Sequence, residues 1–151
     1  MPHYGFVRAS DDVLAVRNGL AAQAIQALHR AGLPAFEEGA VGTDNQPGAV
    51  VEVAADAETA SAPVFVRWRC DPSMIQAAVD GPASGDTDTS AYRYPGTAGL
   101  HMQNVLIKIL LSAGIIATLD NDNMNPERVL VFGMMSDLSP ALRPTFVPPG
   151  N

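Results

Sequence analysis

Two arginines that alternate along one apolar segment are the residues of this sequence best suited to bind a ligand. Arg67 and Arg69 fall in residues 64–70, a run typical of a β-strand. Side chains two positions apart in a strand point to the same face, so the two guanidinium groups and Phe65 share one face. Such a pair can hold a planar carboxylate or a phosphate. The alternative is a solvated strand face on which the arginines pair with Glu52 on a neighbouring strand.

A second cluster, formed by Tyr92, Arg93 and Tyr94, closes a stretch rich in Gly, Ser, Thr and Asp at residues 81–96. Tyrosine and arginine are enriched at the centres of protein interfaces, so this cluster is a candidate contact with a protein partner. The alternative is that one tyrosine packs down and anchors the stretch. A long segment of this composition in a compact domain is usually functional or disordered, and we expect residues 81–96 to be a flexible loop.

Cys70 is the one cysteine of the chain and ends the same apolar segment. Its neighbours on that strand face are apolar, which favours a buried structural thiol. The alternative is a thiolate stabilised by the N-terminus of a helix that starts at Pro72, although Asp71 adds a negative charge there. One cysteine cannot form an intrachain disulfide, which fits a reducing compartment.

No motif points to a metal site, a phosphate loop or a catalytic nucleophile. Residues 120–131 depart from the calcium-loop pattern, with Asn125 at the glycine position and Val131 at the final glutamate position. Neither a Gly-rich phosphate loop nor a GxSxG elbow occurs. The three histidines lack the spacing of metal ligands: His3, His29 and His101. We therefore expect no metal, no cofactor and no catalytic residues.

Composition favours a folded, acidic protein. The chain has 151 residues, of which 47% are hydrophobic and 17% charged, and this composition argues against disorder of the whole chain. Its formal net charge of −7 opposes binding to a phosphate backbone, and we expect no nucleic-acid partner. The longest apolar run, residues 105–117, is too short and too interrupted to span a membrane, and the first residues lack a signal-peptide pattern. We expect a cytoplasmic protein.

The hydrophobic pattern predicts three helices and five strands. The first helix begins after the capping residue Ser10, with a stripe of apolar residues from Val13 to Leu28 as its apolar face. A small-residue linker follows the second strand, and a polar loop precedes the last strand. The helices are expected at residues 11–31, 72–79 and 98–113, and the strands at residues 33–38, 49–53, 64–70, 115–119 and 129–132.

An Ala-Gly step ends an amphipathic run twice, at Gly32 and again at Gly114, and an apolar run follows each time. A helix that closes on a left-handed glycine and continues into a strand has this pattern. The fold class we predict is α+β, with helices on one face of a mostly antiparallel sheet in the order α-β-β-β-α-α-β-β. The repeated step suggests an internal αββ pseudo-repeat. Residues 1–135 form a single domain, and residues 136–151 form a Pro-rich extended arm.

No motif identifies a family. The order of elements resembles that of small α+β proteins that act as secretion chaperones or as subunits of phage tail and head-completion assemblies, a likeness of element order alone. We expect a non-enzymatic protein–protein interaction or assembly module that forms a homo-oligomer or caps a protein partner. One alternative is a protein or enzyme that binds a small anion through Arg67 and Arg69, and another is an acidic inhibitor or immunity protein.

Overall fold

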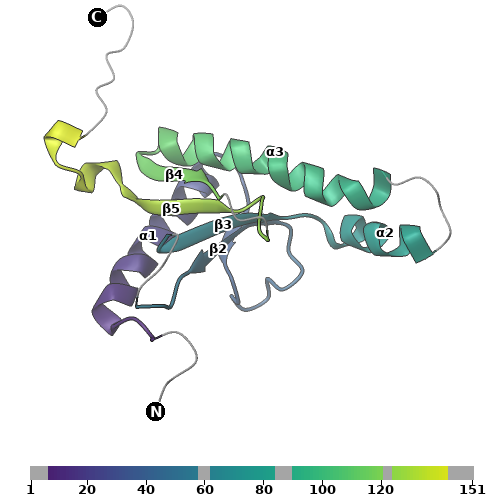
Figure 1. The fold of residues 1–151 in the computed structure, drawn as a ribbon, viewed down its shortest axis with the longest axis horizontal. Helices are drawn as coiled ribbons and strands as arrows, with labels where there is room; N and C mark the ends of the chain where they lie inside the picture. Colours follow the sequence, from purple (N-terminus) through teal and green to yellow (C-terminus); the bar gives the residue numbers. More distant parts are fainter. Residues whose placement is uncertain (1–6, 58–61, 84–89, 121–123, 143–151) are drawn as a thin grey trace, which may run out of the picture.

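The strands form one five-stranded sheet in the order β1-β2-β3-β5-β4 (Figure 1). The structure is a computed structural model that describes residues 7–57, 62–83, 90–120 and 124–142. Strand β1 runs parallel to β2, and the other neighbouring pairs are antiparallel, which confirms a mostly antiparallel sheet. The strands are β1 (Ala35–Glu37), β2 (Gly48–Val53), β3 (Val64–Arg69), β4 (Ile115–Leu119) and β5 (Val129–Met134).

Helices α1 (Asp11–Arg30) and α3 (Ser90–Ser112) pack on one face of this sheet and touch each other. Helix α1 lies over β1 and β2, and α3 lies mainly over β4 and β3. Helix α2 (Pro72–Ala83) packs against α3, and the two project together beyond the sheet (Figure 1). The predicted α+β class and element order are therefore confirmed. Within the described ranges, none of the helices has the length and apolar character needed to cross a bilayer.

Local sequence signals set both ends of α1. The Ser10 hydroxyl accepts a hydrogen bond from the backbone N–H of Val13, and two aspartates occupy the first turn, where the helix dipole favours negative charge. At the other end the N–H of Leu33 donates to the carbonyl of Leu28 at 3.0 Å, and the N–H of Gly32 to that of His29 at 2.9 Å. These two bonds form a Schellman motif, as the Ala-Gly step predicts.

Helix α3 also ends on a left-handed glycine, and the N–H of Gly114 donates to the carbonyl of Leu111 at 3.0 Å. Gly32 and Gly114 have φ angles of +90° and +79°, and an edge strand of the sheet follows each within three residues. The strands that follow then pair differently, because β1 is parallel to β2 whereas β4 and β5 form an antiparallel pair with a bulge. The helix-to-strand junction therefore repeats, and the pairing beyond it does not.

The core lies between the helices and the sheet. Leu28 of α1 and Leu106 and Leu110 of α3 are fully buried against valines from the central strands. Burial of an aliphatic side chain of this size contributes about 1.5–3 kcal/mol. The strand valines that alternate toward this layer are Val51, Val64, Val66, Val129 and Val131.

The predicted loop at residues 81–96 is wrong at both ends. Helix α2 continues to Ala83, and α3 begins at Ser90, although residues 90–96 include Pro95 and Gly96. The composition of this stretch favours a loop, but packing between α2 and α3 outweighs the local preference. Residues 84–89 lie outside the described ranges.

The predicted extended arm begins as two short 3₁₀ turns, η1 (Met135–Asp137) and η2 (Pro140–Leu142). The N–H of Leu138 donates to the carbonyl of Met135 at 3.1 Å, and that of Leu142 to Ser139 at 2.9 Å. Prolines permit such single turns because each turn needs few backbone donors. The rest of the predicted arm, residues 143–151, lies outside the described ranges.

Gly48 is expected to be essential for the parallel pairing of β1 with β2. Its φ is +142°, and an added Cβ would lie 2.9 Å from both Cβ and the carbonyl oxygen of Pro34. Gly48→Ala should therefore cost at least about 2 kcal/mol of unfolding free energy in urea titrations. Gly39→Ala is the control, because Gly39 has φ +80° but open space around it, and should cost about 1 kcal/mol. Equal losses in the two variants would contradict the steric argument.

Candidate functional site

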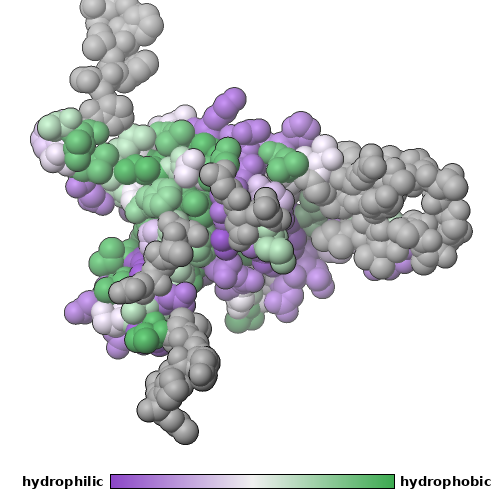
Figure 2. All heavy atoms as spheres, in the orientation of Figure 1, coloured by the Kyte–Doolittle hydropathy of each residue, from purple (hydrophilic) through white to green (hydrophobic). Residues whose placement is uncertain are grey.

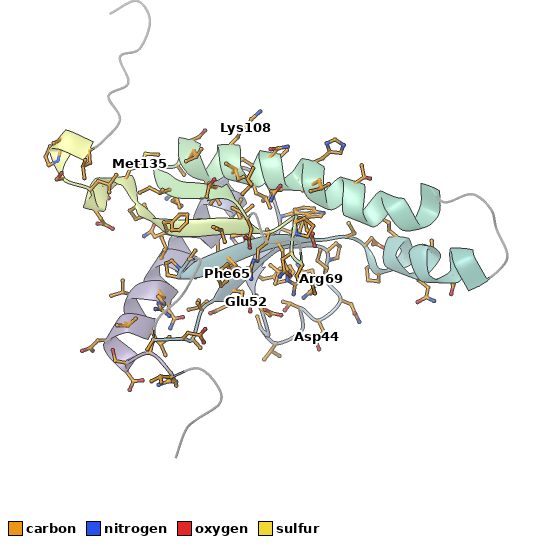
Figure 3. The ribbon with its side chains drawn as sticks, viewed as in Figure 1. Asp44, Glu52, Phe65, Arg69, Lys108 and Met135 are labelled. Atoms are coloured by element: carbon orange, nitrogen blue, oxygen red, sulfur yellow. The ribbon has the colours of Figure 1, made fainter. Side chains whose placement is uncertain are left out.

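The arginine face is the side of the sheet opposite α1 and α3, and it carries Arg67, Arg69 and Arg128. Directly paired residues share a face of a sheet, and Arg67 pairs with Val50 while Phe65 pairs with both Glu52 and Leu130. Figure 3 shows Phe65, Glu52 and Arg69 along β2 and β3, with Asp44 in the loop after β1. The prediction that Arg67, Arg69 and Phe65 share a strand face agrees with this register.

Each predicted ligand-binding arginine already has partners within the chain. Arg67 forms an ion pair with Glu38 at 3.1 Å, in place of the predicted pair with Glu52. Because β1 runs parallel to β2, the residue after β1 reaches Arg67. The Arg69 guanidinium donates to the carbonyl of Thr43 at 2.6 Å and lies 5.5 Å from the Phe36 ring centroid. Both side chains therefore hold the loop between β1 and β2 onto the sheet.

Arg128 is a third arginine of this face, and sequence reasoning did not single it out. Its guanidinium lies 4.1 Å from the centroid of the Phe65 ring and pairs with the buried carboxylate of Asp120 at 2.7 Å. The side chain of Gln103 from α3 donates to the carbonyl of Arg128 at 2.9 Å. Asp120 is the first residue of the segment 120–131 that departs from the calcium-loop pattern, and its carboxylate pairs with Arg128.

Two carboxyl groups meet on the arginine face. Burial raises the pKa of Glu52 above its ordinary value, and the charge of Glu38 and a hydrogen bond between the two carboxyl groups raise it further. Arg67 and Arg128 act in the opposite direction and lower this pKa. The positive charges of the arginines on this face are therefore partly compensated by acidic side chains of the same face.

A hollow of about 350 Å³ lies beside Arg67 and Arg69, next to Asp44 and the start of α2. Cys70 lines it but is buried, and burial raises the pKa of its thiol, which favours the protonated, unreactive form. Asp71 instead caps α2, and hydrogen bonds from Ser73 lower the pKa of this aspartate. These contacts favour the structural interpretation of the cysteine.

The tyrosine cluster is not part of this face. Tyr92, Arg93 and Tyr94 lie in the first turns of α3, in the section that packs with α2 beyond the sheet (Figure 1). The structure brings Arg67 and Arg69 together and places Tyr92–Tyr94 on a separate element. The role of these three residues in partner binding stays a prediction.

A second, larger hollow lies on the other side of the described part of the molecule, between α1 and β5. We name it the α1 groove; its volume is about 590 Å³. Val16 and Leu20 of α1 form one wall, and the β4–β5 hairpin and η1 form the other. Figure 2 shows hydrophobic residues gathered at this end of the molecule, whereas hydrophilic residues predominate over the middle. The opposite wall comes from Ile116, Phe132, Gly133, Met134, Asp137 and Leu138, with Pro63 at the base of β3.

The groove exposes apolar side chains that the sequence pattern assigns to the apolar face of α1. Val16 in the groove is 75% exposed and Val13 in the adjoining hollow is 40% exposed, whereas Ala24 and Leu28 of the same stripe are fully buried. Phe132 on the opposite wall is 44% exposed. The buried side of α1 is rotated from the predicted stripe and includes Arg17. Part of the apolar surface of this helix therefore lies outside the core.

Arg17 holds α1 at the base of the groove, and sequence reasoning missed it. This arginine is 8% exposed, and its guanidinium donates to the carbonyls of Ala54 and Asp56 at 2.6 and 2.7 Å. The same segment pairs with the residues before α1, where the N–H of Ala9 donates to the carbonyl of Ala55 at 2.8 Å. These bonds fix the N-terminal half of α1 against the link between β2 and β3, which keeps Val16 beside the groove.

Comparisons with protein-family models, with curated proteins and with solved structures find no match to this chain.

Glu52→Gln should stabilise the protein at neutral pH, because the raised pKa means that ionising Glu52 costs more in the folded state than in the unfolded state. In the unmodified protein, protonated Glu52 contributes its full stabilisation to the folded state below the unfolded-state pKa of this group. That contribution is lost as the pH rises through the higher folded-state pKa. We expect a gain below about 1 kcal/mol, since the site is partly solvated. Urea unfolding at several pH values measures it, with Glu37→Gln as the control for losing an exposed carboxylate. A gain that is equal in both variants, or larger at acid pH, would contradict the assignment.

Proposed function

We propose that this protein is a non-enzymatic protein–protein interaction module and that it binds an apolar protein segment in the α1 groove. The observation that carries the proposal is the exposure of Val16 and Phe132 on facing walls of one hollow. Exposed apolar surface that is hollowed and contiguous is typical of a protein-binding site. The groove is built from regular elements, with Arg17 fixing one wall and the β4–β5 hairpin forming the other.

The two surfaces differ in what they offer a ligand. On the arginine face, Glu38, Asp120 and backbone carbonyls already accept hydrogen bonds from the three guanidinium groups. A ligand there must replace existing bonds, which reduces its net gain. In the groove a ligand replaces water against apolar side chains, which is the favourable direction of the hydrophobic effect.

The groove can be tested by selecting peptides from a random displayed library on the protein and removing those that also bind the Val16→Asp variant. We expect apolar peptides with dissociation constants on the order of micromolar, weakened by more than about tenfold by Val16→Asp or Phe132→Asp. Val41→Asp is the matched control, because Val41 is fully exposed in the loop after β1, outside the groove. Peptides that bind all variants equally, or a selection without enrichment, would overturn the proposal.

Anion binding at Arg67 and Arg69 is the second candidate, and the hollow that both side chains line is the observation in its favour. A thermal-shift screen with phosphates, nucleotides and carboxylates tests it. A true ligand at a hundredfold over its dissociation constant should stabilise the protein by about 2.7 kcal/mol. The shift should disappear in the Arg67→Ala, Arg69→Ala double variant. No stabilising compound, or a shift that persists in the double variant, would rule this candidate out.

A further inference from the structure

One face of α1 has the spacing of a helix-pairing seam. Its residues recur at alternating intervals of three and four, which is the spacing of the apolar positions of a coiled coil. Each of them lines one of three neighbouring hollows beside α1, of which the α1 groove is the largest. None is fully buried: Val16 is 75% exposed, and Gln23 and Arg30 are exposed as well. The seam consists of Val13, Val16, Leu20, Gln23, Ala27 and Arg30.

The charges along this seam change sign from one end to the other. Asp11 and Asp12 occupy the first turn of α1, and Asp12 lines the hollow at that end. Arg30 lies in the last turn, and Lys108 of α3 lies beside it in the adjoining hollow. A partner with the opposite order of charges is therefore favoured. A second copy of α1 has that order when it runs antiparallel, whereas a parallel copy places like charges together.

We propose that a second copy of this chain occupies the α1 groove, with the two α1 helices antiparallel across a two-fold axis between Leu20 and Gln23. This inference rests on the proposed function, because it names the occupant of the same groove. In this arrangement Val16 of each copy packs against Ala27 of the other. Arg30 of each copy then lies beside Asp12 of the other.

The two-fold arrangement accounts for the mixed character of the seam. Ala27 leaves room for the larger Val16 side chain, and Leu20 meets the aliphatic part of Gln23. Each copy contributes the same residues, so both halves of the interface form together. The net charge of −7 on each copy opposes association at long range, but salt screens this repulsion beyond roughly 8–10 Å.

Disulfide trapping tests the antiparallel register directly. In a Cys70→Ala background, the full chain with Val16→Cys and Ala27→Cys should form a covalent dimer under mild oxidation, detected on non-reducing gels. Val16→Cys alone and Ala27→Cys alone should form much less, because each cysteine then faces a non-cysteine residue. Single variants that cross-link as well as the double variant indicate a parallel or collisional contact and overturn the proposal.

Sedimentation of the full chain measures the association itself, and charge reversal tests its cause. We expect a dimer that Arg30→Asp weakens by about tenfold, because aspartate then faces aspartate. Adding Asp12→Arg to Arg30→Asp should restore the dimer in an antiparallel pair. Circular dichroism confirms that α1 still folds in each variant. A dimer indifferent to these changes, or a chain that stays monomeric at high concentration, contradicts the inference.

Two further outcomes identify other occupants. Truncation after Leu142 should leave the dimer intact; loss of the dimer would indicate that residues 143–151 make the contact and would overturn the antiparallel seam. A monomeric chain whose groove still binds selected peptides would overturn the dimer while leaving the proposed function in place. A chain that neither dimerises nor binds peptides at Val16 would overturn both.

Discussion

The position of α1 depends on one buried charged side chain. Arg17 extends from the helix to two backbone carbonyls in the link between β2 and β3, and charge-assisted bonds of this kind are stronger than those between neutral groups. Residues 54–57 of this link lie outside the strands, so their carbonyls need donors from elsewhere. Arg17 donates to two of these carbonyls and the N–H of Ala9 donates to a third, and the two bonds from Arg17 hold the helix in its rotation. That rotation turns Leu28 into the core and leaves Val16 beside the groove.

The fold class could be predicted because it depends on local signals. The caps of α1, the glycines after α1 and α3 and the alternation in β3 are each visible over a few residues. The rotation of α1 could not be predicted, because the helix carries apolar residues over more than one face and periodicity alone does not say which face is covered. The helical start of residues 90–96 was hidden for a related reason, since its support comes from α2.

The candidate site was predictable in part. Alternation along β3 was enough to place Arg67 and Arg69 on one face. The partners of these arginines were not predictable. The parallel pairing of β1 with β2 brings Glu38 and the following loop over the sheet, and neither segment contains a local signal for that pairing. The α1 groove went unrecognised because Val16 and Leu20 satisfy the pattern of core residues as well as that of an interface.

The edges of the sheet limit how large an assembly can become. Strand β1 is three residues long and follows Pro34, which has no backbone N–H, and β4 is five residues long. Short or proline-flanked edges are poor templates for a further strand. Growth by strand addition, the route to fibres, is therefore disfavoured in this protein. The proposed two-fold seam uses the same patch on both copies and closes on itself, so association through it would end at two chains.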